Sequence, residues 1–96
     1  MESDMAARSK ICHDDGDLLV GERNTDYGDP SDMHDRAAEI FTAMTDRQVS
    51  GLMVAQMLIA VKLARLHHQP THRDSWVDLC GYAGIGYEIA IREKVQ

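Results

Sequence analysis

Cysteine and aromatic residues are scarce in this chain, and each scarcity limits the class of protein. The two cysteines, Cys12 and Cys80, are too few for a disulfide framework, and they have neither zinc-site spacing nor Cys-x-x-Cys spacing. We expect both to be reduced thiols in a cytoplasmic protein. The aromatic residues are one Trp, one Phe and three Tyr, against six Met. This balance favours either a core or a binding surface that is rich in methionine.

Long apolar runs and nucleotide-loop motifs are also absent. No run reaches the roughly 18 apolar residues that a membrane helix needs. The first ten residues, MESDMAARSK, carry too many charges for a secretory signal. There is no glycine loop of the Walker or dinucleotide type, no strand-like alternation and no internal repeat. We therefore expect no membrane partner and a cytoplasmic location.

Clustered basic residues are missing as well, because charge is unevenly distributed. Residues 1–35 hold ten acids and three bases, whereas residues 36–96 hold six acids and seven bases. This pattern argues against direct DNA binding, which needs clustered Lys and Arg. Residues 1–14 lack apolar periodicity and are predicted to be a flexible acidic arm. The acidic N-terminal part is expected to be solvated, and the alternatives are that it engages a basic partner or mimics nucleic acid. Residues 15–96 are predicted to form a single helical domain.

Helical periodicity is what the sequence does contain. Asp29 followed by Pro30 is typical of a helix start, with Asp29 as the N-cap. Thr45 and Gln48 have the spacing of a capping box, which predicts a second helix over residues 46–68. The first helix is expected to bury one apolar stripe, made of Met33, Ala37, Ile40, Phe41 and Met44.

A third helix is predicted after the loop at Pro70, from about residue 74 to residue 94. Its buried stripe is expected to be Trp76, Leu79, Cys80, Ala83, Tyr87, Ala90 and Ile91. Glycine is a poor helix former, so we expect glycines here where a neighbouring helix or a ligand approaches closely. These glycines are Gly81, Gly84 and Gly86. The predicted fold is all-α, a helix hairpin with a preceding helix.

The second helix lacks a polar back. Between Leu52 and Val61 the only polar residue is Gln56, so apolar side chains point in every direction. Two neighbouring helices cover two sides of this helix, and soluble monomers avoid exposing a large apolar patch. We therefore expect two hairpins to pair into a helical-bundle homodimer. The alternative is that Leu18 and Leu19 cover the third side within one chain.

Charged residues near the loop of the hairpin form a candidate site. Lys62 and Arg65 share one face of the second helix, and Asp74, Asp78 and Tyr82 form a row on the third. Because the short loop folds the third helix back, the two bases are expected to face Asp78 and Tyr82. One interpretation is a structural ion-pair cluster that closes the hairpin. The other is a polar pocket in which the bases hold phosphate and the acids hold Mg²⁺.

Three histidines near the same loop do not indicate zinc. His67 and His68 are adjacent and therefore point in different directions on a helix. No fourth ligand accompanies these two residues and His72. Nothing in the sequence suggests a Ser–His–Asp or Cys–His arrangement either, so we name no catalytic residue.

Three separated runs of the sequence combine into one pattern: Glu-Arg-x-x-x-Tyr-Gly-Asp, then Lys-x-x-Arg, then His-x-Asp-x-x-x-Asp-x-x-Gly-Tyr. The residues that carry it are Glu22, Arg23, Tyr27, Gly28 and Asp29; Lys62 and Arg65; and His72, Asp74, Asp78, Gly81 and Tyr82. Over residues 17–90 the chain thereby resembles a functionally uncharacterised family of small helical proteins encoded by phages and prophages. The resemblance implies a location in the cytoplasm of a host bacterium.

The chain is more remotely similar to MazG-like nucleotide pyrophosphohydrolases. Those enzymes are all-α and usually oligomeric, bind Mg²⁺ through two acidic pairs, and cleave nucleoside triphosphates to monophosphate and pyrophosphate. The similarity implies Mg²⁺ as a cofactor, with the candidate ligands Asp74, Asp78, Glu22 and Asp29. It implies ligand or phosphate contacts for Lys62, Arg65, His72, Tyr82 and Tyr27. The chain departs from the pattern because residues 48–68 contain no acid, which leaves the metal site incomplete.

Three functions are compatible with these observations. The first is an accessory phage protein that binds a host protein to modulate or inhibit it, which the small size, the acidic arm and the incomplete metal site favour. The second is a divergent MazG-like pyrophosphohydrolase. The third is a nucleotide-binding domain that keeps the pocket and lacks the chemistry. We rank the accessory protein first and leave enzyme activity open.

Overall fold

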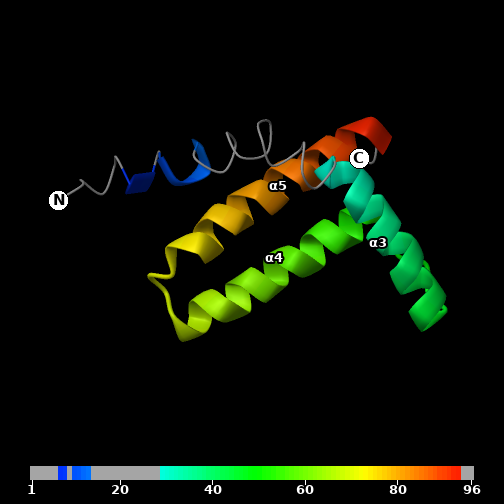
Figure 1. Ribbon diagram of the computed structural model, residues 1–96, viewed down its shortest axis with the longest axis horizontal. Helices are drawn as coiled ribbons and strands as arrows, with labels where there is room; N and C mark the ends of the chain where they lie inside the picture. Colours follow the sequence, from blue (N-terminus) through cyan, green and yellow to red (C-terminus); the bar gives the residue numbers. More distant parts are fainter. Residues whose placement is uncertain (1–6, 9, 14–28, 94–96) are drawn as a thin grey trace.

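The computed structural model describes residues 7, 8, 10–13 and 29–93, and this part of the chain is all-α. Its body consists of α3 (Pro30–Thr45), α4 (Gly51–His68) and α5 (Arg73–Glu93). Residues 7, 8 and 10–13 are also helical. As Figure 1 shows, α4 and α5 run antiparallel as a hairpin, and α3 crosses the open end of that hairpin. The predicted hairpin with a preceding helix is confirmed. Among the described residues, no helix is both long enough and apolar enough to cross a membrane.

The first predicted helix start is confirmed in detail. Asp29 has extended backbone, and its carboxylate accepts a hydrogen bond of 2.9 Å from the Ser31 amide. Pro30 follows in the first turn, where a missing N–H costs nothing. α3 ends because Asp46 adopts a left-handed conformation with φ of 57°. The Asp46 amide then turns back to the Thr42 carbonyl at 2.9 Å.

The second helix begins later than predicted, because the capping box assigned to Thr45 and Gln48 does not form. The Thr45 hydroxyl instead donates to the Phe41 carbonyl, 2.7 Å away on its own helix. Ser50 is the N-cap of α4, and its hydroxyl accepts from the Met53 amide at 3.2 Å. The left-handed residue at the end of α3 redirects the chain, so a loop has to precede the next helix.

A tight turn joins α4 to α5. The His72 ring caps α5: its Nδ1 accepts from the Ser75 amide at 3.3 Å and lies 2.7 Å from the Ser75 hydroxyl. The Trp76 indole N–H donates to the Pro70 carbonyl at 2.8 Å. The side chains of His72, Ser75 and Trp76 therefore hold the loop at Pro70, which the sequence predicted, against the start of α5.

Small and branched side chains fill the core where the three helices meet. Gly86 of α5 lies over Ala55 of α4, and a Cβ at residue 86 would stand 3.4 Å from the Ala55 Cβ. This is the close helix approach expected at one of the three glycines, whereas Gly84 faces open space. The buried apolar residues are Ala38, Val54, Ala55, Leu66, Val77, Ile85 and Ile89.

The predicted apolar stripe of the first helix is wrong in phase. Met33, Ile40, Phe41 and Met44 are all exposed. The side of α3 that packs against the hairpin instead carries Ser31, His34 and Ala38. These residues are small or can hydrogen-bond at the helix start, so they let α3 approach the hairpin closely. The larger apolar side chains are left outside.

The predicted stripe of the third helix is wrong in the same way. Trp76, Tyr87 and Ile91 are exposed, although the sequence placed them in the core. The buried face of α5 is rotated away from them and consists of Ser75, Val77, Gly81, Ile85, Gly86 and Ile89. In this helix glycine and serine permit close packing that a Trp or Tyr would block. Periodicity alone does not distinguish two faces that both contain apolar residues.

Cys12 and Cys80 form a disulfide, with their Cα atoms 5.2 Å apart. The prediction of two reduced thiols is therefore wrong. The contact joins residues 68 positions apart in sequence, and cysteine spacing carries no information about such a contact. The bond fastens helical residues 10–13 of the predicted arm to α5. Leu18, Leu19 and most of the arm lie outside the described residues.

Candidate functional site

The candidate site is a row of polar side chains that follows α5 and joins it to both other helices. At one end Lys62 of α4 pairs with Asp78 of α5. In the middle Tyr82 of α5 lies against His34 of α3. At the far end Arg92 of α5 binds Ser31 of α3. We call these six residues the polar row: Lys62, Asp78, Tyr82, His34, Ser31 and Arg92.

The ion pair at the loop end of the row is half-buried. Lys62 Nζ lies 2.9 Å from Asp78 Oδ2, and the two side chains are 20% and 29% exposed. Arg65 and Asp74, which the sequence placed beside this pair, are exposed and make no ion pair within the described residues. His72 is occupied with Ser75. The pair is thus a single bridge between α4 and α5.

His34 carries the most unusual atom of the row. The residue is only 7% exposed, and its Nδ1 lies 2.8 Å from the Pro30 carbonyl. Because a carbonyl can only accept, Nδ1 carries a proton and donates it to Pro30. Nε2 is buried without a hydrogen-bond partner in the described structure. A buried polar atom without a hydrogen bond destabilises the fold by about 1–3 kcal/mol, so a ligand that formed a hydrogen bond with Nε2 would remove this cost.

The Tyr82 ring is the neighbour that the row provides for His34. The two ring centroids are 6.2 Å apart, and the planes are tilted by 54°. Tyr82 lies one helical turn beyond Asp78, as the sequence predicted from their spacing. The histidine was missed by sequence reasoning. The available signal was its position four residues before Ala38 and four after Pro30, on the side of the helix that carries no large apolar residue.

Arg92 anchors the end of α5 to the start of α3. Its Nη1 donates to the Ser31 hydroxyl at 3.2 Å, and its Nη2 donates to Asp35 Oδ2 at 3.1 Å. The Ser31 hydroxyl in turn donates to Asp29 Oδ1 at 2.8 Å. The Ser31 hydroxyl and then the Ser31 amide stabilise the charged carboxylate, which lowers the pKa of Asp29 below its ordinary value. Asp29 thus serves as a helix cap in this network.

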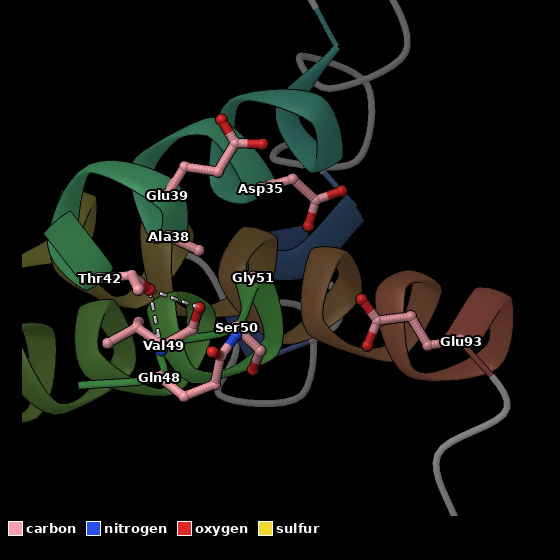
Figure 2. A pocket seen from close by; sticks show the side chains of 9 residues that line it. All are labelled: Asp35, Ala38, Glu39, Thr42, Gln48, Val49, Ser50, Gly51 and Glu93. Atoms are coloured by element: carbon pink, nitrogen blue, oxygen red, sulfur yellow. Dashed lines mark hydrogen bonds between the residues drawn. The ribbon is translucent and has the colours of Figure 1, made fainter. Parts of the chain in front are cut away.

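An open hollow of about 440 Å³ lies beside this anchor, between α3, the loop before α4 and the end of α5. Figure 2 shows Asp35 and Glu39 on one side and Glu93 on the other. The loop that forms its floor is held by Thr42, whose hydroxyl donates to the Val49 carbonyl at 3.2 Å and accepts from the Val49 amide at 3.0 Å. The hollow is therefore bordered by carboxylates and shaped by a fixed loop.

The structure brings together only part of the predicted set of site residues. Lys62 and Asp78 are in contact, Tyr82 follows them, and Asp29 lies at the opposite end of α5 from this pair. Tyr27 and Glu22 lie outside the described residues. Within the described part of the chain, no three His, Cys, Asp or Glu side chains are grouped so that they could hold a metal ion. Sequence reasoning missed His34, Ser31, Asp35 and Arg92, because their contacts join the start of α3 to the end of α5.

Comparison with known proteins identifies the family. Residues 10–90 match a family model described as Domain of unknown function (DUF6378). The Gene 55 protein of Mycobacterium phage D29 is 39% identical over 67 residues, which are 70% of this chain and 44% of that protein. The Gene 55 protein of Mycobacterium phage L5 is 36% identical over 70 residues, 72% of this chain and 45% of that protein.

The chain therefore spans less than half the length of these two relatives. No solved structure matches it significantly. The family model covers most of the chain, and its relatives are phage proteins, as the residue pattern predicted. The chain belongs to the DUF6378 family, a domain family of unknown function, and is similar to proteins of two mycobacteriophages.

Proposed function

We propose that this chain is an accessory phage protein that binds a host protein through the outer face of α5. The observation that carries the proposal is the exposure of Trp76, Tyr87 and Ile91, which are 44%, 71% and 55% exposed. With Ala83 they fall on one side of the helix at 3.6 residues per turn. Trp and Tyr contribute most strongly to protein interfaces, and an exposed apolar stripe typically marks an interaction site.

The outer face of α5 is also held rigid. The Trp76 indole is fixed by its hydrogen bond to the Pro70 carbonyl, and the Cys80 side chain on the same face is fixed by the disulfide to Cys12. A preordered face loses less conformational entropy when it binds a partner. Exposed Glu88 directly follows Tyr87 in the helix, and the chain carries a net charge of −6. These charges favour a partner with an apolar cleft and a basic rim.

The test is a binding measurement with matched variants. Tagged protein captures candidate partners from host lysate, and the dissociation constant is then measured with the purified partner. We expect Trp76→Ala and Tyr87→Ala each to weaken binding about 30-fold, which corresponds to about 2 kcal/mol. Leu63→Ala, at an exposed position of α4, is the control and should bind as the parent does. A partner that binds both α5 variants as tightly as the parent contradicts the proposal.

A second candidate function is nucleotide binding at the polar row. The observation that favours it is the buried, unpartnered Nε2 of His34 beside Tyr82, on the row that begins with Lys62. Mg²⁺-dependent hydrolysis is a poorer fit, because the Asp78 carboxylate pairs with Lys62 rather than with a second carboxylate. Thermal stabilisation by a panel of nucleoside triphosphates, lost in His34→Phe and without release of pyrophosphate, would favour binding alone. Stabilisation that His34→Phe retains would place the ligand elsewhere.

A further inference from the structure

We infer that a second copy of this chain docks along the back of α4, antiparallel to it, around a two-fold axis near Ala60. The back of α4 is the side turned away from the core. It consists of the exposed residues Met53, Met57, Ala60, Ala64 and His67. This inference is independent of the proposed function, which uses the outer face of α5.

The spacing of this face is that of a helix with a partner. Its positions alternate between steps of four and three residues, the 3.5-residue repeat found where two helices pack along their length. Val61 flanks the face and is also exposed. The opposite side of α4 faces the core with Gly51, Ala55 and Leu66. α4 is thus apolar on both sides, and only one side is covered by α3 and α5 in the described structure.

Charge complementarity indicates a second copy as the occupant. Residues 29–50 hold five carboxylates and two guanidinium groups, a net of −3. Residues 51–72 hold no acid. Lys62 pairs with Asp78 of its own chain, whereas Arg65, His67 and His68 are exposed near the end of α4. Antiparallel pairing places the basic end of one α4 beside the other copy's acidic α3. Parallel pairing would bring the two basic ends together.

The position of α3 supports the same arrangement. In Figure 1 the C-terminal half of α3 continues past α4 on the side away from α5. We call this part together with the C-cap Asp46, residues 39–46, the overhang. It exposes three apolar side chains, Ile40, Phe41 and Met44, and two acids, Glu39 and Asp46.

Two-fold pairing sets each overhang against the other copy's α4. The 18 residues of α4 span about 27 Å, a narrow seam by itself. An overhang at each end broadens the contact toward the roughly 800 Å² per partner that stable dimers bury. In this arrangement the second copy covers Ile40, Phe41 and Met44, which are exposed at the end of α3 in a single chain.

Light scattering after size exclusion tests the dimer. We expect the parent to elute at twice 10.7 kDa at high micromolar concentration. Ala60→Glu should elute as a monomer with unchanged helical circular dichroism, because the two-fold axis sets like charges against each other. Met57→Glu should do the same, because it would bury a charge in an apolar contact. Ala83→Glu places the same charge on the exposed face of α5 and should stay dimeric. A monomeric parent, or folded α4 variants that dimerise like the parent, would overturn the inference.

Cross-linking tests the orientation. Under mild oxidation Ala60→Cys should form a covalent dimer, because residue 60 lies at the axis and meets its own copy. Met53→Cys should not, because antiparallel pairing sets residue 53 opposite residue 67. Efficient cross-linking of Met53→Cys would contradict the antiparallel arrangement.

The dissociation constant of the parent dimer should also rise with salt, since salt screens the attraction between α3 and α4. A dissociation constant that does not change with salt would contradict the charge pairing.

Discussion

The Cα of Gly51 lies so close to the Asp35 side chain that a Cβ at residue 51 would collide with the carboxylate. The same carboxylate accepts a hydrogen bond of 3.1 Å from Arg92. Three helices therefore meet at one contact, since Asp35 belongs to α3, Gly51 to α4 and Arg92 to α5. The absence of a side chain at the start of α4 is what allows α3 to approach and reach Arg92.

Gly51→Ala should lower the free energy of unfolding by about 1–3 kcal/mol, because the Asp35 side chain has to move and its bond to Arg92 is strained or lost. Gly84→Ala is the matched control. A Cβ at residue 84 meets nothing within 4 Å, so this change should stabilise the protein by about 0.5–1 kcal/mol. Chemical denaturation measures both. Equal stabilisation by the two substitutions would show that the contact at Gly51 is not tight.

Acid should weaken the cap of α3. The pKa of Asp29 is lowered in the folded protein from an unfolded value of about 3.9. Its contribution to stability is therefore fully present above about pH 4 and is lost as pH falls through the folded pKa. Asp29→Asn keeps an acceptor at the cap and removes the titration, so its stability should converge on that of the parent in acid. NMR titration of Asp29 measures the pKa, and an ordinary value would contradict the assignment.

Asp78→Ala should lower the free energy of unfolding by more than the loss of an exposed ion pair does and by less than the loss of a fully buried one. Breaking a buried pair costs about 3–5 kcal/mol, and exposed pairs contribute about 0–1 kcal/mol. With both side chains partly exposed, we expect about 1–3 kcal/mol. A double-mutant cycle with Lys62→Met isolates the interaction. Additive effects of the two substitutions would show that the Lys62–Asp78 bridge contributes nothing to stability.

Reduction of the Cys12–Cys80 disulfide should destabilise the protein. The bond closes a loop of 68 residues, and loop-closure entropy gives about 4 kcal/mol for a loop of that size. Cys12→Ser should therefore have a lower melting temperature than the parent when dithiothreitol is absent. The melting temperature of the parent should fall by the same amount when dithiothreitol is added. Deleting residues 1–14 removes the same bond, and we expect that shortened chain to be less stable and still helical. A parent protein whose stability is unaffected by dithiothreitol would contradict this expectation.

Local hydrogen-bonding rules correctly predicted those helix ends that are formed by residues close together in the sequence. The Asp29–Pro30 start and the loop at Pro70 depend on neighbouring residues, and both appear as expected. The start of α4 was predicted too early because Thr45 and Ser50 both suit an N-cap. The left-handed Asp46 between them ends α3 and leaves Ser50 as the cap of α4.

Long-range contacts account for what could not be predicted. Helical periodicity predicted the wrong buried face on both α3 and α5, because each helix also has a second face that contains small residues. Packing chose the second face, because Gly51, Ser31 and Gly86 allow closer helix approach than Phe41 or Tyr87 would. In the candidate site, the spacing of Asp78 and Tyr82 was readable because they share one helix. Arg92 and Ser31 are 61 residues apart, and no local pattern connects them.

Trp76 is the chain's one tryptophan, and its indole is bound to the Pro70 carbonyl at the turn between α4 and α5. The tryptophan fluorescence of the protein, excited selectively at wavelengths that tyrosine does not absorb, therefore originates at a single known place. Opening of this turn would break the hydrogen bond and expose the rest of the indole, which is 44% exposed in the fold, and so would shift its emission to longer wavelength. Separation of α3 from the other end of the hairpin, near Arg92, would leave the emission unchanged. Comparing fluorescence with far-ultraviolet circular dichroism thus distinguishes loss of the turn from loss of the whole helical fold, without an added label.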